Sequence, residues 1–258
     1  MLDNYACDDA THMPRWHKGD DVIGIELEVE GKESQSCAER YIRDIDGFAD
    51  DYVCLKRDGS LGPHGVEIVT RPDHIEEHKR KWSRFFDNKP SRSLRSWDTR
   101  RCGMHVHVNR DWLTPLQTAK AVVFTNEPHN MHLLQSVAGR YQSKWCSYSK
   151  KKLAKNYPGP RGQPDWLNRR TAVNTLGEYT IEFRIFRGTL ARDGFFKNLE
   201  FVLAVLDFCK PAARSIADAQ SYRKFLGHVQ ENRREYPLLY KFLCDKDFIP
   251  KPKKRKQD

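Results

Sequence analysis

The sequence predicts an α+β fold built on a mostly antiparallel sheet, and three observations support this. Short stretches alternate between apolar and polar residues, most clearly at 22–30 and 103–109. Other stretches, such as 34–48 and 75–87, carry apolar residues at helical spacing. Strands joined by hairpins, or by helices on one side of a sheet, are the arrangement of an α+β domain.

The predicted elements follow one another without an internal repeat or a linker. Strands are expected at 22–30, 52–55, 66–70, 103–109 and 178–187, and helices at 34–48, 75–87, 114–140 (a pair), 194–210, 217–228 and 231–244. Asp193 is the expected N-cap of the long apolar helix. We expect residues 1–20 to be irregular, 21–249 to form a single domain, and 250–258 to be a disordered basic tail.

The composition of the 258 residues fits a polar globular protein, with 38% hydrophobic and 31% charged residues. Neither a membrane-spanning run nor a secretory signal is recognisable, so no membrane partner is expected. The seven cysteines are scattered and contain no C-x-x-C pair, which argues against a disulfide framework or a zinc ribbon and favours a reducing, cytoplasmic location. The net charge is +10, of which the segment 250–258 contributes +4 and the rest +6.

Polar residues of unusual type follow one face of the predicted strands. Since alternate side chains of a strand share a face, the groups on that face are Glu26, Glu28 and Glu30, then His105, His107 and Asn109, then Thr180, Glu182 and Arg184, with Glu67 set in an apolar strand between them. A face in water would explain each strand taken singly. Neighbouring glutamates repel one another, however, and clustered carboxylates with an imidazole suit Mg²⁺ or Mn²⁺. Together they predict a metal site.

Two basic stretches that contain aromatic residues accompany this face. Residues 78–101 hold nine Lys/Arg against two acids, and residues 140–170 hold nine against one. Arginine and lysine suit phosphate or carboxylate groups. With metals, they describe a site for a nucleoside triphosphate and an anionic substrate. They equally describe a nucleic-acid groove, so a metal-dependent nuclease and a nucleic-acid-binding protein remain alternatives.

Four motifs in a fixed order resemble the amidoligase family, which is grouped with glutamine synthetase and glutamate–cysteine ligase among the carboxylate–amine ligases. The motifs are Gly-Ile-Glu-Leu-Glu at 24–28, Asp-Gly-Ser at 58–60 with Glu-Ile-Val-Thr-Arg-Pro at 67–72, Cys-Gly-Met-His-Val-His-Val at 102–108, and Thr-Ile-Glu-Phe-Arg-Ile-Phe-Arg-Gly-Thr at 180–189. The resemblance covers about residues 22–190. It implies a curved antiparallel sheet with metals and ATP on its concave face and helices outside.

The resemblance also implies roles for individual residues. The implied metal ligands are Glu26, Glu28, Glu67, His105 and Glu182, with Asp58 standing where the synthetases offer another glutamate. Arg184 matches the arginine that contacts substrate or phosphate, and Arg169, Arg170 and Arg187 are further candidates for the phosphates. His107 points the same way as His105 and is expected to contact substrate or support a ligand. The base that deprotonates the amine has no identifiable counterpart.

The resulting expectation is an ATP- and Mg²⁺-dependent carboxylate–amine ligase that works through an acyl phosphate, with Mn²⁺ as an alternative metal. The substrates would be a small-molecule or peptide carboxylate and an amine. The positive charge of the body also admits a polyanionic or nucleic-acid-linked substrate. Specificity resides in the loops, where the sequence carries no recognisable code.

Overall fold

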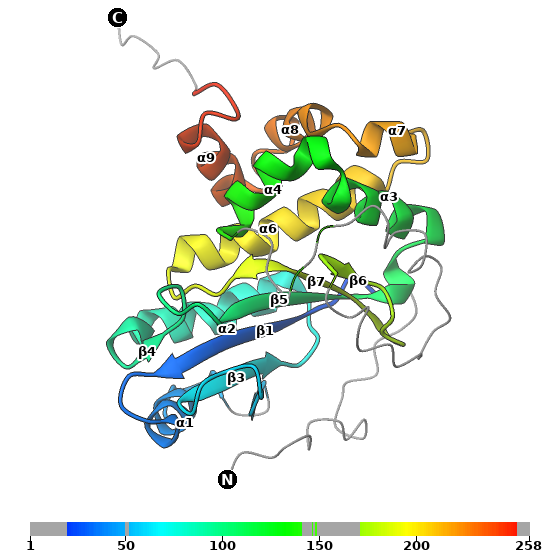
Figure 1. Cartoon of the computed structure of the whole chain (residues 1–258). Coiled ribbons are helices and arrows are strands. Elements are labelled where there is room, and N and C mark those ends of the chain that lie inside the picture. Colours follow the sequence, from blue (N-terminus) through cyan, green and yellow to red (C-terminus); the bar gives the residue numbers. More distant parts are fainter. Residues whose placement is uncertain (1–19, 50–51, 141–145, 147, 149–170, 252–258) are drawn as a thin grey trace, which may run out of the picture.

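The computed structural model describes residues 20–49, 52–140, 146, 148 and 171–251, and the centre of this part of the chain is an antiparallel sheet (Figure 1). Its strands lie in the order β2-β3-β1-β5-β7-β6, with β4 paired to the end of β1. The strands are β1 Ile23–Gly31, β2 Val53–Lys56, β3 Gly65–Thr70, β4 Leu94–Arg95, β5 Gly103–Asn109, β6 Val173–Asn174 and β7 Thr180–Arg187. The sheet is open and uncurled, so the predicted site lies on a face of the sheet and not inside a barrel.

Helices cover the apolar face of this sheet. They are α1 Gln35–Arg43, α2 Ile75–Asp87, α3 Pro115–Asn126, α4 Met131–Ala138, α6 Arg192–Cys209, α7 Ile216–Ala219, α8 Tyr222–Glu231 and α9 Pro237–Asp245, with short 3-10 turns at Pro90–Arg92, Arg110–Trp112 and Pro128–Asn130. In Figure 1, α6 runs along the sheet, and α7, α8 and α9 lie beyond it, away from the strands. The α+β class with helices outside an antiparallel sheet is therefore confirmed.

One hydrophobic core joins the strands to the helices. The inward residues of the central strands, such as Leu27, Val106 and Phe183, are fully buried. Trp82 of α2 stacks against Phe195 of α6 with ring centroids 4.4 Å apart. Burying apolar surface is the main favourable contribution to folding, so the alternating strands leave only their opposite face for chemistry.

The predicted strands and the helix 75–87 are confirmed within two residues, and the differences lie at helix ends. α1 begins at its Ser34 cap as expected but ends at Arg43, because the chain then turns through Gly47 at a positive φ of 64°. The expected N-cap Asp193 lies inside the first turn of α6, and the N-cap is Ala191. The carboxylate of Asp193 is still favourably placed near the helix N-terminus.

The end of the chain holds three helices where the sequence predicts two. Ser221 caps α8 and so separates it from α7, with its hydroxyl accepting from the Lys224 N–H (3.4 Å). Asn232 ends α8, and α9 begins with Pro237 in the first turn, where the missing N–H costs nothing. The two-residue strands β4 and β6 were not predicted.

The cysteines depart from the sequence-based expectation at one position. Cys54 is disulfide-bonded, whereas Cys37, Cys102, Cys146, Cys209 and Cys244 are free thiols. In the part of the chain that the structure describes, every helix is too short or too polar to cross a bilayer.

Candidate active site

The strand registers bring the predicted acids together on the polar face of the sheet. Glu26 of β1 lies opposite His105 of β5 on one side and Val69 of β3 on the other. Glu28 lies opposite Glu67 of β3. Side chains directly opposite each other in an antiparallel pair have Cβ atoms about 5 Å apart, so these groups meet without any loop rearrangement.

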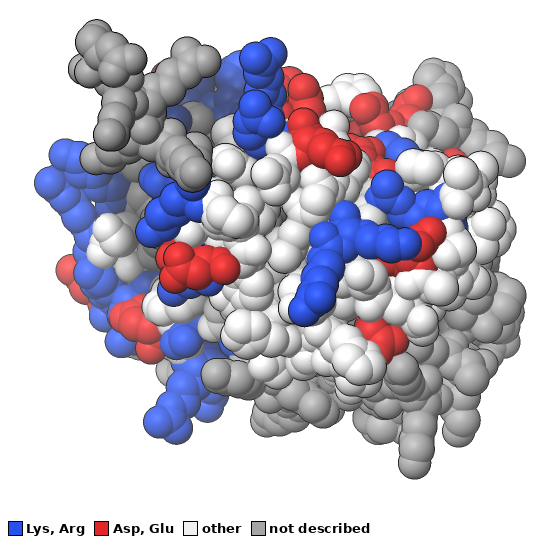
Figure 2. Space-filling view, turned by 90° about the horizontal axis from the view of Figure 1, so that it is seen from above, with Lys and Arg blue, Asp and Glu red and all other residues white. Residues whose placement is uncertain are grey.

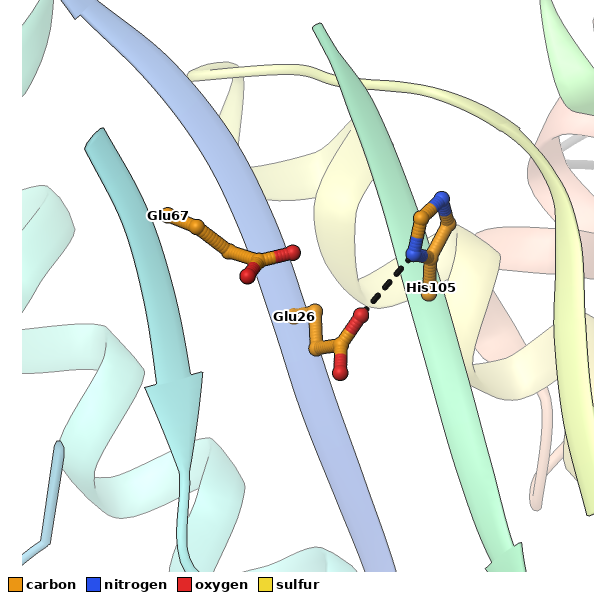
Figure 3. A group of neighbouring side chains, drawn as sticks. All are labelled: Glu26, Glu67 and His105. Carbon is orange, nitrogen blue, oxygen red and sulfur yellow. Dashed lines mark hydrogen bonds and ion pairs between the residues drawn. The ribbon is translucent and has the colours of Figure 1, made fainter. Parts of the chain in front are cut away.

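These side chains form three overlapping groups of three residues. Within each group, the potential ligand atoms lie within 4.8 Å of one another. The groups are Glu26–Glu67–His105, Glu26–His107–Glu182, and Glu28–Asp58–Glu67. Figure 3 shows the first: Glu26 lies between Glu67 and His105, and His105 Nδ1 is hydrogen-bonded to Glu26 Oε2 at 2.9 Å. Because Glu26 and Glu67 each belong to two groups, neighbouring cations held here would share a carboxylate. Hard carboxylate oxygens with an imidazole fit Mg²⁺ or Mn²⁺.

Asp58 joins the cluster from the turn between β2 and β3. Its Oδ1 accepts a hydrogen bond from the Ser60 N–H (2.7 Å), and the Leu61 N–H bonds to its carbonyl (3.1 Å). This Asx-type turn aims the carboxylate back toward Glu28 and Glu67. The loop acid that the sequence associated with the metal shell therefore lies beside the strand acids.

The pKa values of the clustered carboxylates are shifted in different directions. Burial, followed by repulsion from Glu26, Glu28 and Asp58, raises the pKa of Glu67 to about 9. Burial also raises the pKa of Glu28. Burial would raise the pKa of Glu26 as well, but attraction to His107 and the hydrogen bond with His105 lower it well below its usual value. Without a cation, the Glu67 carboxyl is therefore protonated at neutral pH, and a divalent cation bound here would displace that proton and favour the ionised form.

At the β7 side of the cluster, His107 lies beside the carboxylates of Glu26 and Glu182. Burial opposes protonation of His107, yet the attraction of the nearby Glu26 carboxylate raises the His107 pKa to about 9. His107 Nε2 lies 3.1 Å from Glu26 Oε1. The pKa of Glu182 is lowered despite burial, because His107 and Arg184 favour its charged form. An imidazolium in this place is a proton donor or an anion contact, which suits the substrate role expected of His107.

A bulge in β7 decides which arginines reach the polar face. The register shifts between Met104 and Val106, so that Ile185 and Phe186 are both buried and Arg187 pairs with Gly103. Strict alternation would have turned Arg187 into the core. The inserted residue returns it to the polar face, in the way that bulges redirect side chains.

The predicted phosphate-binding arginines lie in different surroundings. Arg184 forms an ion pair with Glu182, and its Nε is buried without a hydrogen-bond partner among the described residues. Arg187 instead stacks on the Trp97 ring at 4.6 Å and reaches the Thr99 carbonyl at 3.5 Å. Arg169 and Arg170 lie outside the described residues, as does most of the basic stretch 140–170.

Arg140 is a site residue that sequence reasoning missed. Its Nε donates to the Ile185 carbonyl (3.1 Å), and its Nη2 donates to the Arg184 carbonyl. A Cβ placed on Gly103 would lie 3.2 Å from Arg140 Nη1 and 3.3 Å from a Glu28 carboxylate oxygen, so the guanidinium and Glu28 flank this glycine. Glu28 in turn accepts the Gly103 N–H. The available signal was Gly139, whose left-handed conformation ends α4 and turns the chain toward the sheet.

The comparisons with known proteins add a weak structural likeness. No family model and no curated protein matches the sequence. Among solved structures, the chain is similar to one in the crystal structure of the complex between the prokaryotic ubiquitin-like protein Pup and its ligase PafA, with a TM-score of 0.32 and 13% identity. The match covers 90% of this chain and 59% of that chain, so this chain spans less than two thirds of the matched one. At this score the likeness supports no residue correspondence.

Proposed function

We propose that this chain is an ATP- and Mg²⁺-dependent ligase that joins a carboxylate to an amine, with Mn²⁺ able to replace Mg²⁺. The observation that carries the proposal is the set of three acid-rich groups sharing Glu26 and Glu67, with Arg184 at one end. Enzymes that use a nucleoside triphosphate commonly place divalent cations and a positively charged side chain together beside its phosphates.

In this proposal the acids and His105 bind cations, and the arginines supply fixed positive charge. Glu26, Glu28, Asp58, Glu67, His105 and Glu182 hold divalent cations. These cations would neutralise charge on the phosphates. Arg184 adds a fixed positive charge beside the same oxygens, and Arg140 supports Glu28 from behind Gly103. Side chains positioned in advance stabilise a transferring phosphoryl group without reorganising during the reaction.

The proposed chemistry has two balanced steps. A carboxylate oxygen of the first substrate attacks the γ-phosphorus of ATP, the bond to the bridging oxygen breaks, and ADP leaves with an acyl phosphate formed. The nitrogen of the amine then attacks the acyl carbon, phosphate leaves, and the nitrogen loses a proton. In this proposal His107, which lies beside Glu26 and Glu182, contacts the anionic groups of the intermediate. The first substrate is a small-molecule or peptide carboxylate in this proposal, including one carried on a polyanion.

Burial of the site favours this reading over a nuclease. Glu28, His105 and Glu182 are only 5%, 5% and 6% exposed. A duplex needs metal ligands that an outside phosphodiester can reach, whereas a small substrate can enter an enclosed site. The protected position of these side chains therefore supports a small-molecule or flexible-chain reaction.

The test is an ADP-release assay with Mg²⁺ against a panel of acids and amines, with mass spectrometry of the products. We expect ADP only when an acid and an amine are both present, together with a product lighter than their sum by one water. Incubating the protein with DNA or RNA and Mg²⁺ without ATP is the parallel arm. Cleavage of the nucleic acid, without acid-dependent ADP release, would replace the ligase with a nuclease.

A further inference from the structure

A pocket of about 480 Å³ lies among the C-terminal helices and shares no residue with the acid cluster. Its walls come from the turn after α6, from α7 and from α8. In Figure 1 these helices lie beyond α6, on the side away from the strands. Its charged and polar lining consists of Arg214, Asp218, Lys224, His228 and Glu231.

Arg214 is held in place but lacks an ionic partner. Its guanidinium carbon lies 4.0 Å from the centroid of the Phe208 ring, which fixes the plane of the group. Its Nη1 is buried and makes no hydrogen bond with the described residues. No carboxylate among them is recorded within ion-pair distance of it. A buried donor without a partner destabilises the folded state, and more strongly when it is charged.

His228 presents a second unpaired donor to the same pocket. The side-chain amide nitrogen of Asn232 lies 3.2 Å from His228 Nδ1 and can only donate, so Nδ1 is the acceptor and the proton is assigned to Nε2. Burial, followed by the charge of Arg214, lowers the His228 pKa, which keeps the ring in this neutral form at neutral pH. The Nε2 atom is buried without a partner among the described residues.

The acids that line the pocket do not satisfy these donors. Asp218 accepts from the Ser215 N–H (2.9 Å) and pairs with Lys224, so both charges of that pair are occupied. Glu231 is exposed at the end of α8. The pocket is therefore lined by one positive charge without an ionic partner and by two buried N–H groups without an acceptor among the described residues.

We propose that Arg214 and His228 bind an oxyanion, the phosphate or carboxylate group of a small ligand. The guanidinium supplies charge and a fork of donors, and Nε2–H supplies a neutral donor at its side. On the helical side of the molecule Lys/Arg and Asp/Glu side chains are interspersed with uncharged surface (Figure 2). A single anionic group suits this surface better than a long polyanion, which needs a continuous positive field.

The experiment is a titration of the full chain with inorganic phosphate at constant ionic strength, without ATP or divalent metal. The readout is the ¹H–¹⁵N correlation of the His228 ring, assigned with His228→Gln. A parallel titration with acetate separates a carboxylate ligand from a phosphate ligand. Arg214→Gln tests the site, and Arg223→Gln, an exposed arginine of the neighbouring helix turn, is the matched control.

We expect a saturable shift of the His228 signal with phosphate or acetate in the wild type and in Arg223→Gln, and an affinity at least tenfold weaker in Arg214→Gln. If Arg214→Gln does not fold, Arg214→Lys, which keeps the charge but loses the planar fork, is expected to weaken binding by a similar factor. No saturable shift with either anion, or equal affinity in the Arg214 variants, would overturn the proposal. The readout does not depend on ligase activity, so it stands or falls separately from the proposed function.

Discussion

Glu28 on β1 and Glu67 on β3 face each other directly across the β1–β3 ladder. Like charges in such a pair destabilise a sheet, and here both side chains are also largely withdrawn from water. We infer that the two opposed carboxylates are stabilised in the functional protein by binding a cation between them. The pair therefore offers a direct test of cation binding.

We expect Glu67→Gln to remove the response of the protein to divalent metal. In the wild type, Mn²⁺ or Mg²⁺ should raise Tm relative to EDTA, because binding to the folded state stabilises it. In Glu67→Gln this rise should fall by more than half, while Tm in EDTA should be equal to or above that of the wild type, because glutamine replaces a carboxyl group that burial and neighbouring acids keep uncharged without metal. Thermal denaturation by circular dichroism measures both. Glu76→Gln, on an exposed face of α2, is the matched control and should keep the full response. An unchanged response in Glu67→Gln would remove this residue from the site.

His105→Asn and Glu28→Ala should each reduce ADP release by about a hundredfold or more, since in the proposed function each is a ligand of the cations that neutralise the phosphates. Their circular dichroism spectra should match the wild type. His129→Asn, an exposed histidine on the helical side, should retain full activity. Normal turnover in purified His105→Asn would separate the metal cluster from the chemistry.

His78 should make the stability fall at mildly acidic pH. The Tyr52 hydroxyl donates to His78 Nδ1 (2.5 Å), and Nε2 donates to the Ile23 carbonyl (2.8 Å), so the folded state needs the neutral ring. Burial lowers the His78 pKa below its ordinary 6.5. Below pH 6.5, His78 binds a proton in the unfolded chain but not in the folded chain. The free energy of unfolding therefore decreases by up to about 1.4 kcal/mol for each pH unit.

Urea unfolding between pH 8 and pH 5 measures this loss against His78→Gln, whose side chain does not titrate. The difference in unfolding free energy between wild type and variant should be constant above about pH 7 and should shrink as the pH falls. A difference that stays constant down to pH 5 would contradict the assignment of a neutral buried ring.

Gly139→Ala should destabilise the protein and disturb Trp97. Gly139 has a φ of 69°, and a Cβ there would lie 2.2 Å from Trp97 Cη2. A strained backbone position costs about 1–3 kcal/mol, and the indole would also have to move from Arg187. Urea unfolding and tryptophan emission measure the two effects. Gly227→Ala, where no neighbouring heavy atom lies within 4 Å, is the control and should be neutral or stabilising. Equal stability of the two variants would contradict both the backbone strain at residue 139 and the close contact with Trp97.

Much of the polar face could be predicted from sequence because alternation is a local property. The two-residue period of β1 and β5 placed Glu26, Glu28, His105 and His107 on one side, and the register then brought them together. The bulge in β7 could not be predicted, because Ile185-Phe186 reads as an ordinary apolar pair. Arg140 was missed because its contacts with β7 arise only in the folded chain. The strands β4 and β6 are too short to give any periodic signal.

The candidate ligands come from segments that are far apart along the chain: Glu26 and His105 are separated by 79 positions. Such contacts form only when the loop between them has closed, which is a slow and late event in folding. A nascent or partly unfolded chain would therefore lack this particular set of ligands until its central strands had aligned. Stabilisation of the protein by dissolved Mn²⁺ would then report completed tertiary assembly and could distinguish native molecules from misfolded ones.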